Sequence, residues 1–113
     1  FLSSSGHARR IIDLVSEDNI FLQYDVYHMQ IMEGNLIDTI SANLDIIGHI
    51  QIAGVPGRHE PDSTQEINYP FLFDAIDETG YNEWMACEYR PRGGTLAGLT
   101  WAHPYGIAPD QAR

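Results

Sequence analysis

The run Gly48-His49-Ile50-Gln51-Ile52-Ala53 is short and mainly apolar, which predicts a buried β-strand. Two similar runs lie on either side of it along the chain, Ile20-Phe21-Leu22-Gln23-Tyr24 and Trp84-Met85-Ala86-Cys87-Glu88-Tyr89. The segments between these runs carry apolar residues at helical spacing. Strands that alternate with helices at intervals of roughly thirty residues are typical of parallel βα units.

Two of the intervening segments predict amphipathic helices. Their apolar stripes are Leu36, Ile37, Ile40 and Leu44 in the first, and Tyr69, Leu72, Phe73 and Ile76 in the second. In the second helix we expect Asn68 as N-cap, Pro70 in the first turn and Gly80 as the C-terminal stop. A further helix is predicted over about Ala8 to Ser16, ahead of the first strand.

Three parallel strands are few for a closed α/β fold. The chain has 113 residues, enough for one small domain. A (β/α)8 barrel needs about 250 residues. The pattern therefore predicts either a very small α/β sheet or nearly half of such a barrel. The chain begins with Phe1 rather than Met, which leaves open that it is a piece of a longer protein.

Composition excludes several classes of partner. The chain has 16 acidic residues against 6 arginines and no lysine, for a net charge of -10. This balance disfavours nucleic acid and anionic membrane surfaces, which bind mainly through cations. The single Cys87 excludes an internal disulfide and a multi-cysteine zinc site. No apolar run reaches the ~18 residues of a membrane span, and no signal-peptide pattern is visible, so we expect a cytoplasmic protein.

Polar side chains gather where each predicted strand ends. They are Asp25 and His28 after the first strand, Gln51, Arg58, His59 and Glu60 at and after the second, and Glu88 and Arg90 at the third. In parallel α/β folds, ligands bind at the carboxyl ends of the strands. The sequence therefore predicts one ligand site at this edge of the sheet.

Each of these residues also has a purely structural interpretation. Asp25 is a possible helix cap. The side chains of His49 and Gln51 share one face of their strand, where a hydrogen-bonded structural pair remains open. Glu88 stands between apolar neighbours, so its carboxylate must be paired, ligated or protonated. Asp, Gln and Glu oxygens would suit Mg²⁺ or Mn²⁺. Cys87 is expected to be a small hydrophobic residue rather than a nucleophile.

Four strings of the sequence are distinctive: Gln23-Tyr24-Asp25-Val26-Tyr27-His28-Met29-Gln30, Ile47-Gly48-His49-Ile50-Gln51-Ile52-Ala53, Val55-Pro56-Gly57-Arg58-His59-Glu60-Pro61 and Cys87-Glu88-Tyr89-Arg90-Pro91. In their order and spacing they resemble the hydroxypyruvate isomerases, which are xylose-isomerase-like (β/α)8 TIM barrels. The resemblance covers residues 1–101, which we interpret as the C-terminal part of such a barrel, with residues 102–113 as a C-terminal tail.

The resemblance implies a fold, a reaction and a set of site residues. The three strands would be the sixth to eighth of the barrel. The reaction would interconvert hydroxypyruvate and 2-hydroxy-3-oxopropanoate, with Glu88 as a catalytic acid/base. The resemblance further implies a divalent metal, Mg²⁺ or Mn²⁺, with Asp25, Gln51 and Glu88 as ligands. It implies His28 and Arg58 as substrate contacts, with Arg90 as the rival of Arg58 for the substrate carboxylate.

One part of the family's site is absent from the chain. The family's first catalytic Glu belongs to a strand that would precede Phe1. We therefore expect the isolated chain to lack activity, and to bind the missing N-terminal half of the barrel or to self-associate. Two alternatives remain open: a 2-oxo-tetronate isomerase or sugar epimerase of the same superfamily, and a catalytically silent folding or interaction unit. A DNA-repair endonuclease is disfavoured, because these strands supply few histidines and the chain is acidic.

Overall fold

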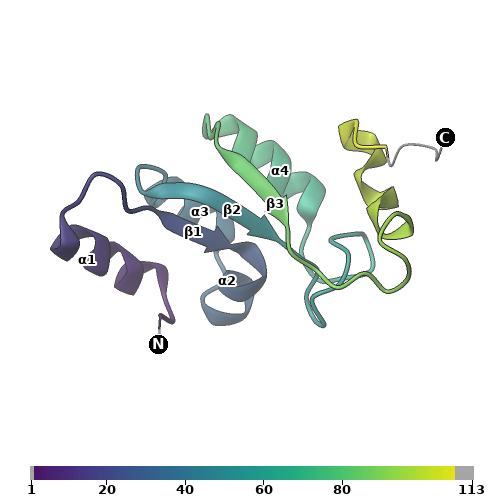
Figure 1. Ribbon diagram of the computed structural model, residues 1–113, viewed down its shortest axis with the longest axis horizontal. Helices are drawn as coiled ribbons and strands as arrows, with labels where there is room; N and C mark the ends of the chain where they lie inside the picture. Colours follow the sequence, from purple (N-terminus) through teal and green to yellow (C-terminus); the bar gives the residue numbers. More distant parts are fainter. Residues whose placement is uncertain (1, 109–113) are drawn as a thin grey trace.

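A computed structural model describes residues 2–108 of the chain (Figure 1). Helices and strands alternate along it as the sequence predicts. The elements are α1 (Ser5–Val15), β1 (Leu22–Asp25), α2 (Val26–Met32), α3 (Leu36–Ala42), β2 (Ile47–Ile52), α4 (Tyr69–Glu78), β3 (Trp84–Cys87) and the 3-10 helix η1 (Ala97–Tyr105). The tail expected over residues 102–113 lies partly outside the described residues, and η1 crosses its expected start.

The three strands form one parallel sheet in the order β1-β2-β3. Asp25, the last residue of β1, lies opposite Gln51 of β2. Ile52 of β2 lies opposite Cys87, the last residue of β3. The prediction of parallel strands is thus confirmed, and all three strands end at the same edge of the sheet.

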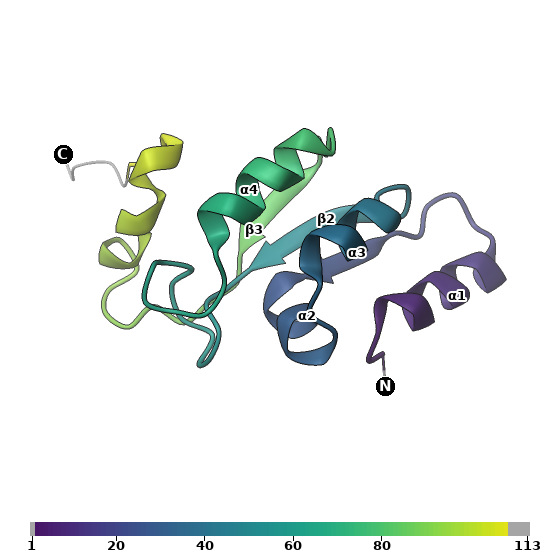
Figure 2. The same ribbon diagram turned by 180° about the vertical axis from the view of Figure 1, so that it is seen from behind.

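The core lies between the sheet and the helices that cover one of its faces. Figures 1 and 2 show α2, α3 and α4 on the same side of the strands. Ile50 and Ile52 of β2 are almost fully buried and pack in one cluster with Leu72 and Ile76 of α4. Because side chains alternate along a strand, His49 and Gln51 point to the opposite face, where they are only partly buried.

The molecule is elongated, with extents of 49 × 26 × 23 Å. Its radius of gyration is 15.1 Å, whereas a compact chain of this length would have about 13 Å. Helix α1 lies beyond β1 at one end (Figure 1), where Arg9 donates to Asn43 and Asp45. Among the described residues, β1 and β3 each pair with one strand only, and Trp84 of β3 is 81% exposed.

Capping residues determine where several helices begin. The Asn68 side chain accepts a hydrogen bond from the Phe71 N–H, as predicted for an N-cap, and Pro70 lies in the first turn of α4. Gly80, with φ of +80°, follows the helix end. Helix α1 begins earlier than predicted, because Ser4 caps it by accepting from the His7 N–H.

β1 and β3 are shorter than predicted, whereas β2 keeps its predicted length and begins one residue earlier, at Ile47. β1 begins at Leu22 rather than Ile20, and Phe21 is 60% exposed. β3 ends at Cys87, two residues before the predicted end. Helix α2, which follows β1 without a loop, was not predicted. The described residues contain no helix long and apolar enough to cross a membrane.

Candidate functional site

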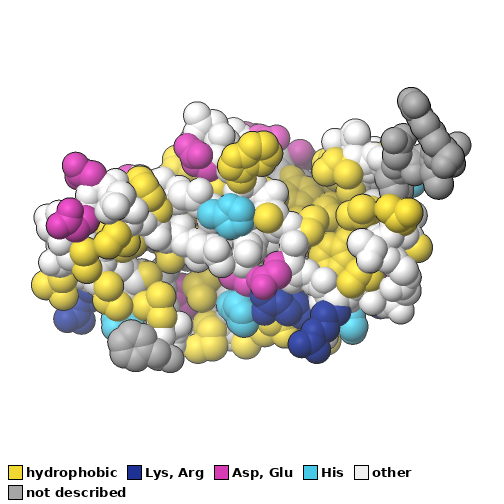
Figure 3. Space-filling view, viewed as in Figure 1, with side chains coloured by type: hydrophobic (Ala, Val, Ile, Leu, Met, Phe, Trp, Pro, Cys, Tyr) yellow, Lys and Arg dark blue, Asp and Glu magenta, His cyan; other side chains and the backbone are white. Residues whose placement is uncertain are grey.

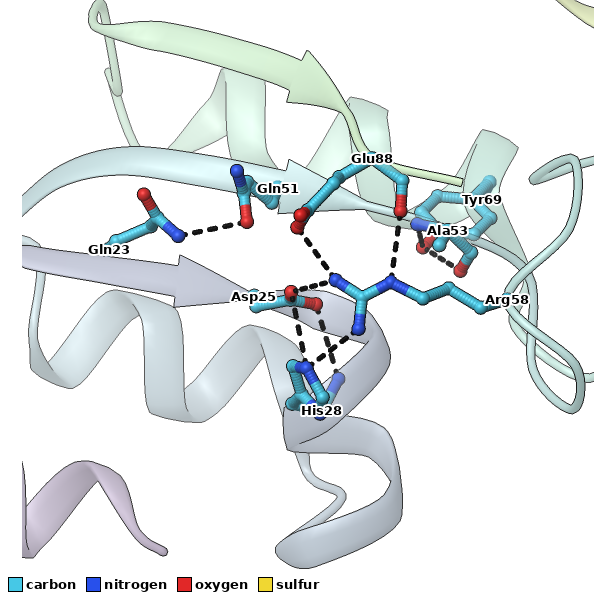
Figure 4. Close-up of polar contacts among 8 residues, drawn as sticks. All are labelled: Gln23, Asp25, His28, Gln51, Ala53, Arg58, Tyr69 and Glu88. Carbon is cyan, nitrogen blue, oxygen red and sulfur yellow. Dashed lines mark hydrogen bonds and ion pairs between the residues drawn. The ribbon is translucent and has the colours of Figure 1, made fainter. Parts of the chain in front are cut away.

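A pocket of about 980 Å³ opens at the carboxyl ends of the strands. It is lined by all five side chains that the sequence marks as site residues: Asp25, His28, Gln51, Arg58 and Glu88. Figure 4 shows Asp25, His28 and Glu88 converging on the Arg58 guanidinium, with Gln51 beside them on β2. Three strand ends and one loop therefore meet in one site.

Asp25 has two structural tasks, one for each carboxylate oxygen. It ends β1 and is the N-cap of α2, where Oδ1 accepts from the His28 N–H at 3.2 Å. This cap turns the chain directly from strand to helix and brings His28 to the strand end. The second oxygen, Oδ2, faces the pocket and accepts from Arg58 Nη2 at 3.0 Å.

Arg58 is carried by a tight turn after β2. The Arg58 N–H donates to the Gly54 carbonyl at 3.0 Å, and the Gly54 N–H donates to the His59 carbonyl at 2.8 Å. A side chain at position 54 would collide with the Glu60 carbonyl, since a Cβ there would lie 2.5 Å from it. Arg58 itself has φ of +57°, a conformation that non-glycine residues rarely adopt.

The turn after β2 is bonded to the segment after β3. The Arg90 N–H donates to the Arg58 carbonyl at 2.8 Å, and His59 Nδ1 lies 2.7 Å from the Arg90 carbonyl. Glu88 follows β3 directly, and its N–H donates to the Ile52 carbonyl at 3.0 Å. These backbone bonds hold the loop of Arg58 and the Glu88 carboxylate on the same side of the sheet edge.

The Arg58 guanidinium is at the centre of the site (Figure 4). Its Nη2 lies 3.0 Å from Asp25 Oδ2 and 2.6 Å from Glu88 Oε2, so one nitrogen bridges two carboxylates. Its Nε donates to the Glu88 carbonyl at 3.1 Å. Its Nη1 lies 2.7 Å from His28 Nε2. Because arginine has only donors, Nε2 must accept in this contact, which requires the tautomer of His28 protonated on Nδ1.

The two carboxylates differ in their access to solvent. The Asp25 side chain is 13% exposed and the Glu88 side chain 55% exposed. The Arg58 guanidinium also stacks over the Tyr27 ring, with Cζ 5.0 Å from the ring centroid. Figure 3 shows acidic, basic and histidine side chains side by side on this part of the surface. Arg58 contacts both carboxylates, but Glu88 is the more exposed of the two and is therefore more available to a ligand than Asp25.

The remaining polar residues of β1 and β2 form a separate contact. Gln51 Oε1 accepts from Gln23 Nε2 at 2.9 Å, so Gln51 forms a hydrogen-bonded pair with Gln23 of the neighbouring strand. Gln23 and Tyr27 were not predicted as site residues. Gln23 lies two residues before Asp25 on β1, so the two side chains point to the same face of the sheet. This alternation is the signal from which Gln23 could have been predicted. No sequence pattern pointed to Tyr27.

Glu60, which the sequence places near the site, serves the loops instead. Its side chain is buried, and Oε1 accepts from the Arg92 N–H at 2.9 Å. Its Oε2 lies 3.2 Å from Arg92 Nη1, an ion pair without a hydrogen bond. Glu60 therefore joins the loop after β2 to the loop after β3 and stabilises the frame that holds Arg58.

The donor atoms of the site suit a hard divalent cation, but Arg58 already contacts the two carboxylates among them. Asp25, Glu88 and Gln51 offer carboxylate and amide oxygens, the ligands that Mg²⁺ and Mn²⁺ prefer. The space between the two carboxylates is taken by Arg58 Nη2. In residues 2–108, no cluster of at least three His, Cys, Asp or Glu side chains has the geometry to hold a metal.

Cys87 lines the same pocket but is poorly suited to nucleophilic chemistry. Although the residue as a whole is exposed, partial burial of the sulfur raises the pKa of the Cys87 thiol above its ordinary value. A raised pKa lowers the thiolate fraction at neutral pH. The chemistry of the site therefore rests on its carboxylates, histidine and arginine.

Comparison with known proteins agrees with this architecture. The chain is 50% identical over 105 residues to a 2-oxo-tetronate isomerase of Cupriavidus necator, covering 93% of this chain and 40% of the relative. It is 49% identical over 104 residues to a hydroxypyruvate isomerase of Escherichia coli, covering 92% of this chain and 40% of the relative. The chain thus spans about 40% of the length of these relatives.

Solved structures show the same fold. A Brucella melitensis protein described as an AP endonuclease of family 2 is 43% identical and superposes with a TM-score of 0.88, over 93% of this chain and 40% of that one. A 3-keto-D-glucoside 4-epimerase of E. coli is 25% identical, with a TM-score of 0.76 over 90% of this chain and 40% of that one. The model of one family, the xylose isomerase-like TIM barrels, matches residues 1–105. The chain therefore belongs to the xylose isomerase-like TIM barrel family.

Proposed function

We propose that the chain is part of an isomerase that interconverts hydroxypyruvate and 2-hydroxy-3-oxopropanoate. The observation that carries this proposal is the meeting of Asp25, Glu88 and Arg58 in an open pocket at the carboxyl ends of the strands. The isomerases among its relatives support the reaction class. The sixth, seventh and eighth strands of the barrel are the portion that we assign to this chain.

The reaction moves a carbonyl group by one carbon. A base removes a proton from C3 of hydroxypyruvate, which breaks the C3–H bond and gives an enediolate. A proton is then delivered to C2, forming the C2–H bond, while a proton passes from the C3 oxygen to the C2 oxygen. Glu88 is suited to one of these transfers because its carboxylate is half exposed to the pocket. A second acid/base from the rest of the barrel would perform the other.

Arg58 and His28 would bind and orient the substrate. A guanidinium binds a carboxylate through parallel hydrogen bonds, and Arg58 brings positive charge to a protein of net charge -10. His28 presents Nε2 to the pocket, 2.7 Å from Arg58 Nη1. In its Nδ1-protonated tautomer this nitrogen accepts, so it would bind the hydroxyl of the substrate. The two residues thus offer one site for the carboxylate and one for the hydroxyl end.

A divalent cation, Mg²⁺ or Mn²⁺, remains part of the proposal. Asp25, Gln51 and Glu88 are the residues that would hold it, and all three line the pocket. When bound, such a cation stabilises the negative charge of an enediolate. The cytoplasmic location, expected because the sequence shows no membrane-spanning run and no signal-peptide pattern, also stays a prediction.

The second candidate is a 2-oxo-tetronate isomerase. The 50% identity to the Cupriavidus necator protein favours it as strongly as the identity to the E. coli protein favours hydroxypyruvate. Both substrates are anionic 2-oxo acids and would use the same Arg58. A DNA endonuclease, the description of the Brucella relative, is less well supported because the net charge of -10 opposes phosphate binding.

The test is a substrate comparison in a complete barrel. Residues 1–105 of this chain replace the matching segment of the E. coli relative, and kcat/KM is measured for hydroxypyruvate and for a 2-oxo-tetronate. We expect turnover of both, with hydroxypyruvate the better substrate. A preference for the 2-oxo-tetronate would favour the second candidate, and no turnover of either would contradict both.

A further inference from the structure

One nitrogen of Arg58 lies where a cation would neutralise both site carboxylates. Nη2 is 3.0 Å from Asp25 Oδ2 and 2.6 Å from Glu88 Oε2. These carboxylates belong to two of the three residues that the proposed function assigns to a divalent cation. A metal ion that bridged Asp25 Oδ2 and Glu88 Oε2 would need the place of this guanidinium nitrogen, and the two positive charges repel each other. Both cannot occupy this position together.

The same contacts limit the access of an anion to Arg58. Its Nε donates to the Glu88 carbonyl, its Nη2 is shared by two carboxylates and its Nη1 faces His28. A substrate carboxylate must therefore displace at least one protein partner to form a two-point contact. Two carboxylates and one guanidinium also leave the cluster with a net charge of -1, which repels an anionic substrate.

The backbone of Arg58 is anchored while its side chain can exchange partners. The backbone is held on both sides, by the Gly54 carbonyl and by the Arg90 N–H. The side chain is 24% exposed, and its Glu88 contact lies at the open side of the pocket, since Glu88 is 55% exposed. The guanidinium can thus turn into the pocket without movement of the sheet.

We propose that Arg58 is an internal cation that competes with the divalent metal, and that metal binding releases it to take the substrate carboxylate. This inference rests on the proposed function and concerns the regulation of the same site. Two consequences follow. Removal of the Arg58 charge strengthens metal binding, and an anionic 2-oxo acid and the metal strengthen each other's binding only when Arg58 is present.

The first test is a Mn²⁺ titration of the 113-residue chain, with free Mn²⁺ measured by electron paramagnetic resonance. Arg58→Gln is compared with Arg90→Gln, which removes the same charge from the lining of the same pocket. We expect the Mn²⁺ affinity to rise about tenfold or more in Arg58→Gln and by less than about threefold in Arg90→Gln. An equal change in both variants, a fall in Arg58→Gln, or no Mn²⁺ binding in any protein would overturn the proposal.

A second set of variants locates the effect and guards against misfolding. Adding Asp25→Asn to Arg58→Gln should abolish the gain, because it removes one of the two shared carboxylates. Arg58→Lys keeps the charge and should remain close to the parent affinity. Far-ultraviolet circular dichroism checks that each variant folds. If Arg58→Lys gained as much affinity as Arg58→Gln, competition by charge would be wrong.

The second test measures coupling with pyruvate, a 2-oxo acid that lacks the C3 hydroxyl needed for isomerisation. Saturating pyruvate should raise the Mn²⁺ affinity of the parent chain several-fold and leave that of Arg58→Gln unchanged. An equal rise in both would show direct chelation and would overturn the coupling. Neither titration needs turnover, so an inactive complete barrel would contradict the proposed function without deciding this inference.

Discussion

At the scale of single residues, Arg58 connects Asp25, His28 and Glu88 in the candidate site. Its positive φ costs about 1–3 kcal/mol for a residue other than glycine. Backbone hydrogen bonds to Gly54 and from Arg90 offset that cost and fix the turn. This turn places the guanidinium where it contacts both Asp25, at the end of β1, and Glu88, directly after β3. The strained backbone conformation of Arg58 therefore places a positive charge at the strand ends.

Glu88→Gln should remove most of the activity of the complete barrel. The amide keeps the shape of the side chain but cannot accept a proton, so we expect kcat to fall at least about 100-fold with little change in KM. Because Glu88 is half exposed, thermal unfolding should show the variant folded. Glu83→Gln makes the same change at an exposed residue just before β3, outside the pocket lining, and is the control that should retain most of kcat. Near-normal turnover of Glu88→Gln would rule out its acid/base role.

Arg58→Ala should act chiefly on KM. Loss of a charge-assisted contact to the substrate carboxylate should raise KM for hydroxypyruvate about tenfold or more. The free energy of unfolding should change by less than the binding free energy that this rise in KM represents. Arg90→Ala provides the comparison, since Arg90 lines the same pocket. If KM rose only in Arg90→Ala, the carboxylate contact would belong to Arg90 instead.

The sequence marked five residues of this candidate site but missed Gln23 and Tyr27, and it did not predict the contacts among them. Asp25, Gln51 and Glu88 follow from their places at strand ends, and the structure brings them to one pocket. The bridge by Arg58 could not be predicted, because it depends on the turn geometry of a long loop and on its bonds to the segment after β3. The cap role of Asp25, considered from the sequence, is confirmed.

At the scale of elements, the joint between β2 and α4 depends on one buried hydroxyl. Tyr69, at the start of α4, donates to the Ala53 carbonyl at 2.7 Å and accepts from the Ala53 N–H at 3.1 Å. Tyr69 is 1% exposed, so water cannot replace these bonds. This single side chain satisfies both backbone groups of the residue that follows β2, at the point where the loop of Arg58 begins.

Tyr69→Phe should destabilise the chain without changing its shape. Two buried backbone groups lose their partner, which should lower the free energy of unfolding by about 2–4 kcal/mol. Urea denaturation measures it, with Tyr105→Phe as the control because Tyr105 is 45% exposed. The control should change by less than about 0.5 kcal/mol. Equal losses in both variants would contradict the importance of the joint.

Helices and strands were predicted correctly where several local signals agree. Elements that are short and lack such signals were missed. Asn68, Pro70 and the apolar stripe of α4 all point to one helix, and that helix forms. Helix α2 has only seven residues and begins directly after a strand, so its residues read as loop. Phe21 was assigned to a strand by its apolarity, but β1 is an edge strand with one partner, and pairing begins only at Leu22.

At the scale of the whole molecule, the three described strands form an open parallel sheet rather than a closed barrel. The sheet has uncovered edges at β1 and β3 within the described residues, and large apolar side chains such as Trp84 and Phe21 are exposed. Figure 3 shows a hydrophobic patch in the region between β3 and η1. Open strand edges favour association with another chain. The missing half of the barrel is the partner that we propose, with self-association as the alternative.

Stability should fall at alkaline pH. Burial raises the pKa of Tyr24 and of Tyr69 above the ordinary value of 10.0. The folded state therefore keeps protons that the unfolded state loses, so this contribution is intact below about pH 10 and declines as pH rises above it. Urea midpoints between pH 8 and pH 11.5 measure the effect. Tyr69→Phe should show a shallower decline, and a midpoint independent of pH in the parent would contradict the prediction.

The most direct measurement compares hydroxypyruvate isomerisation by the isolated chain with that by the joined barrel, which carries residues 1–105 of this chain within the E. coli relative. Both are assayed with and without Mn²⁺, and their masses in solution are determined. The account predicts no turnover by the isolated chain and clear turnover by the joined barrel. Full turnover by the isolated chain would contradict the need for a second half, and an inactive but folded joined barrel would contradict the isomerase assignment itself.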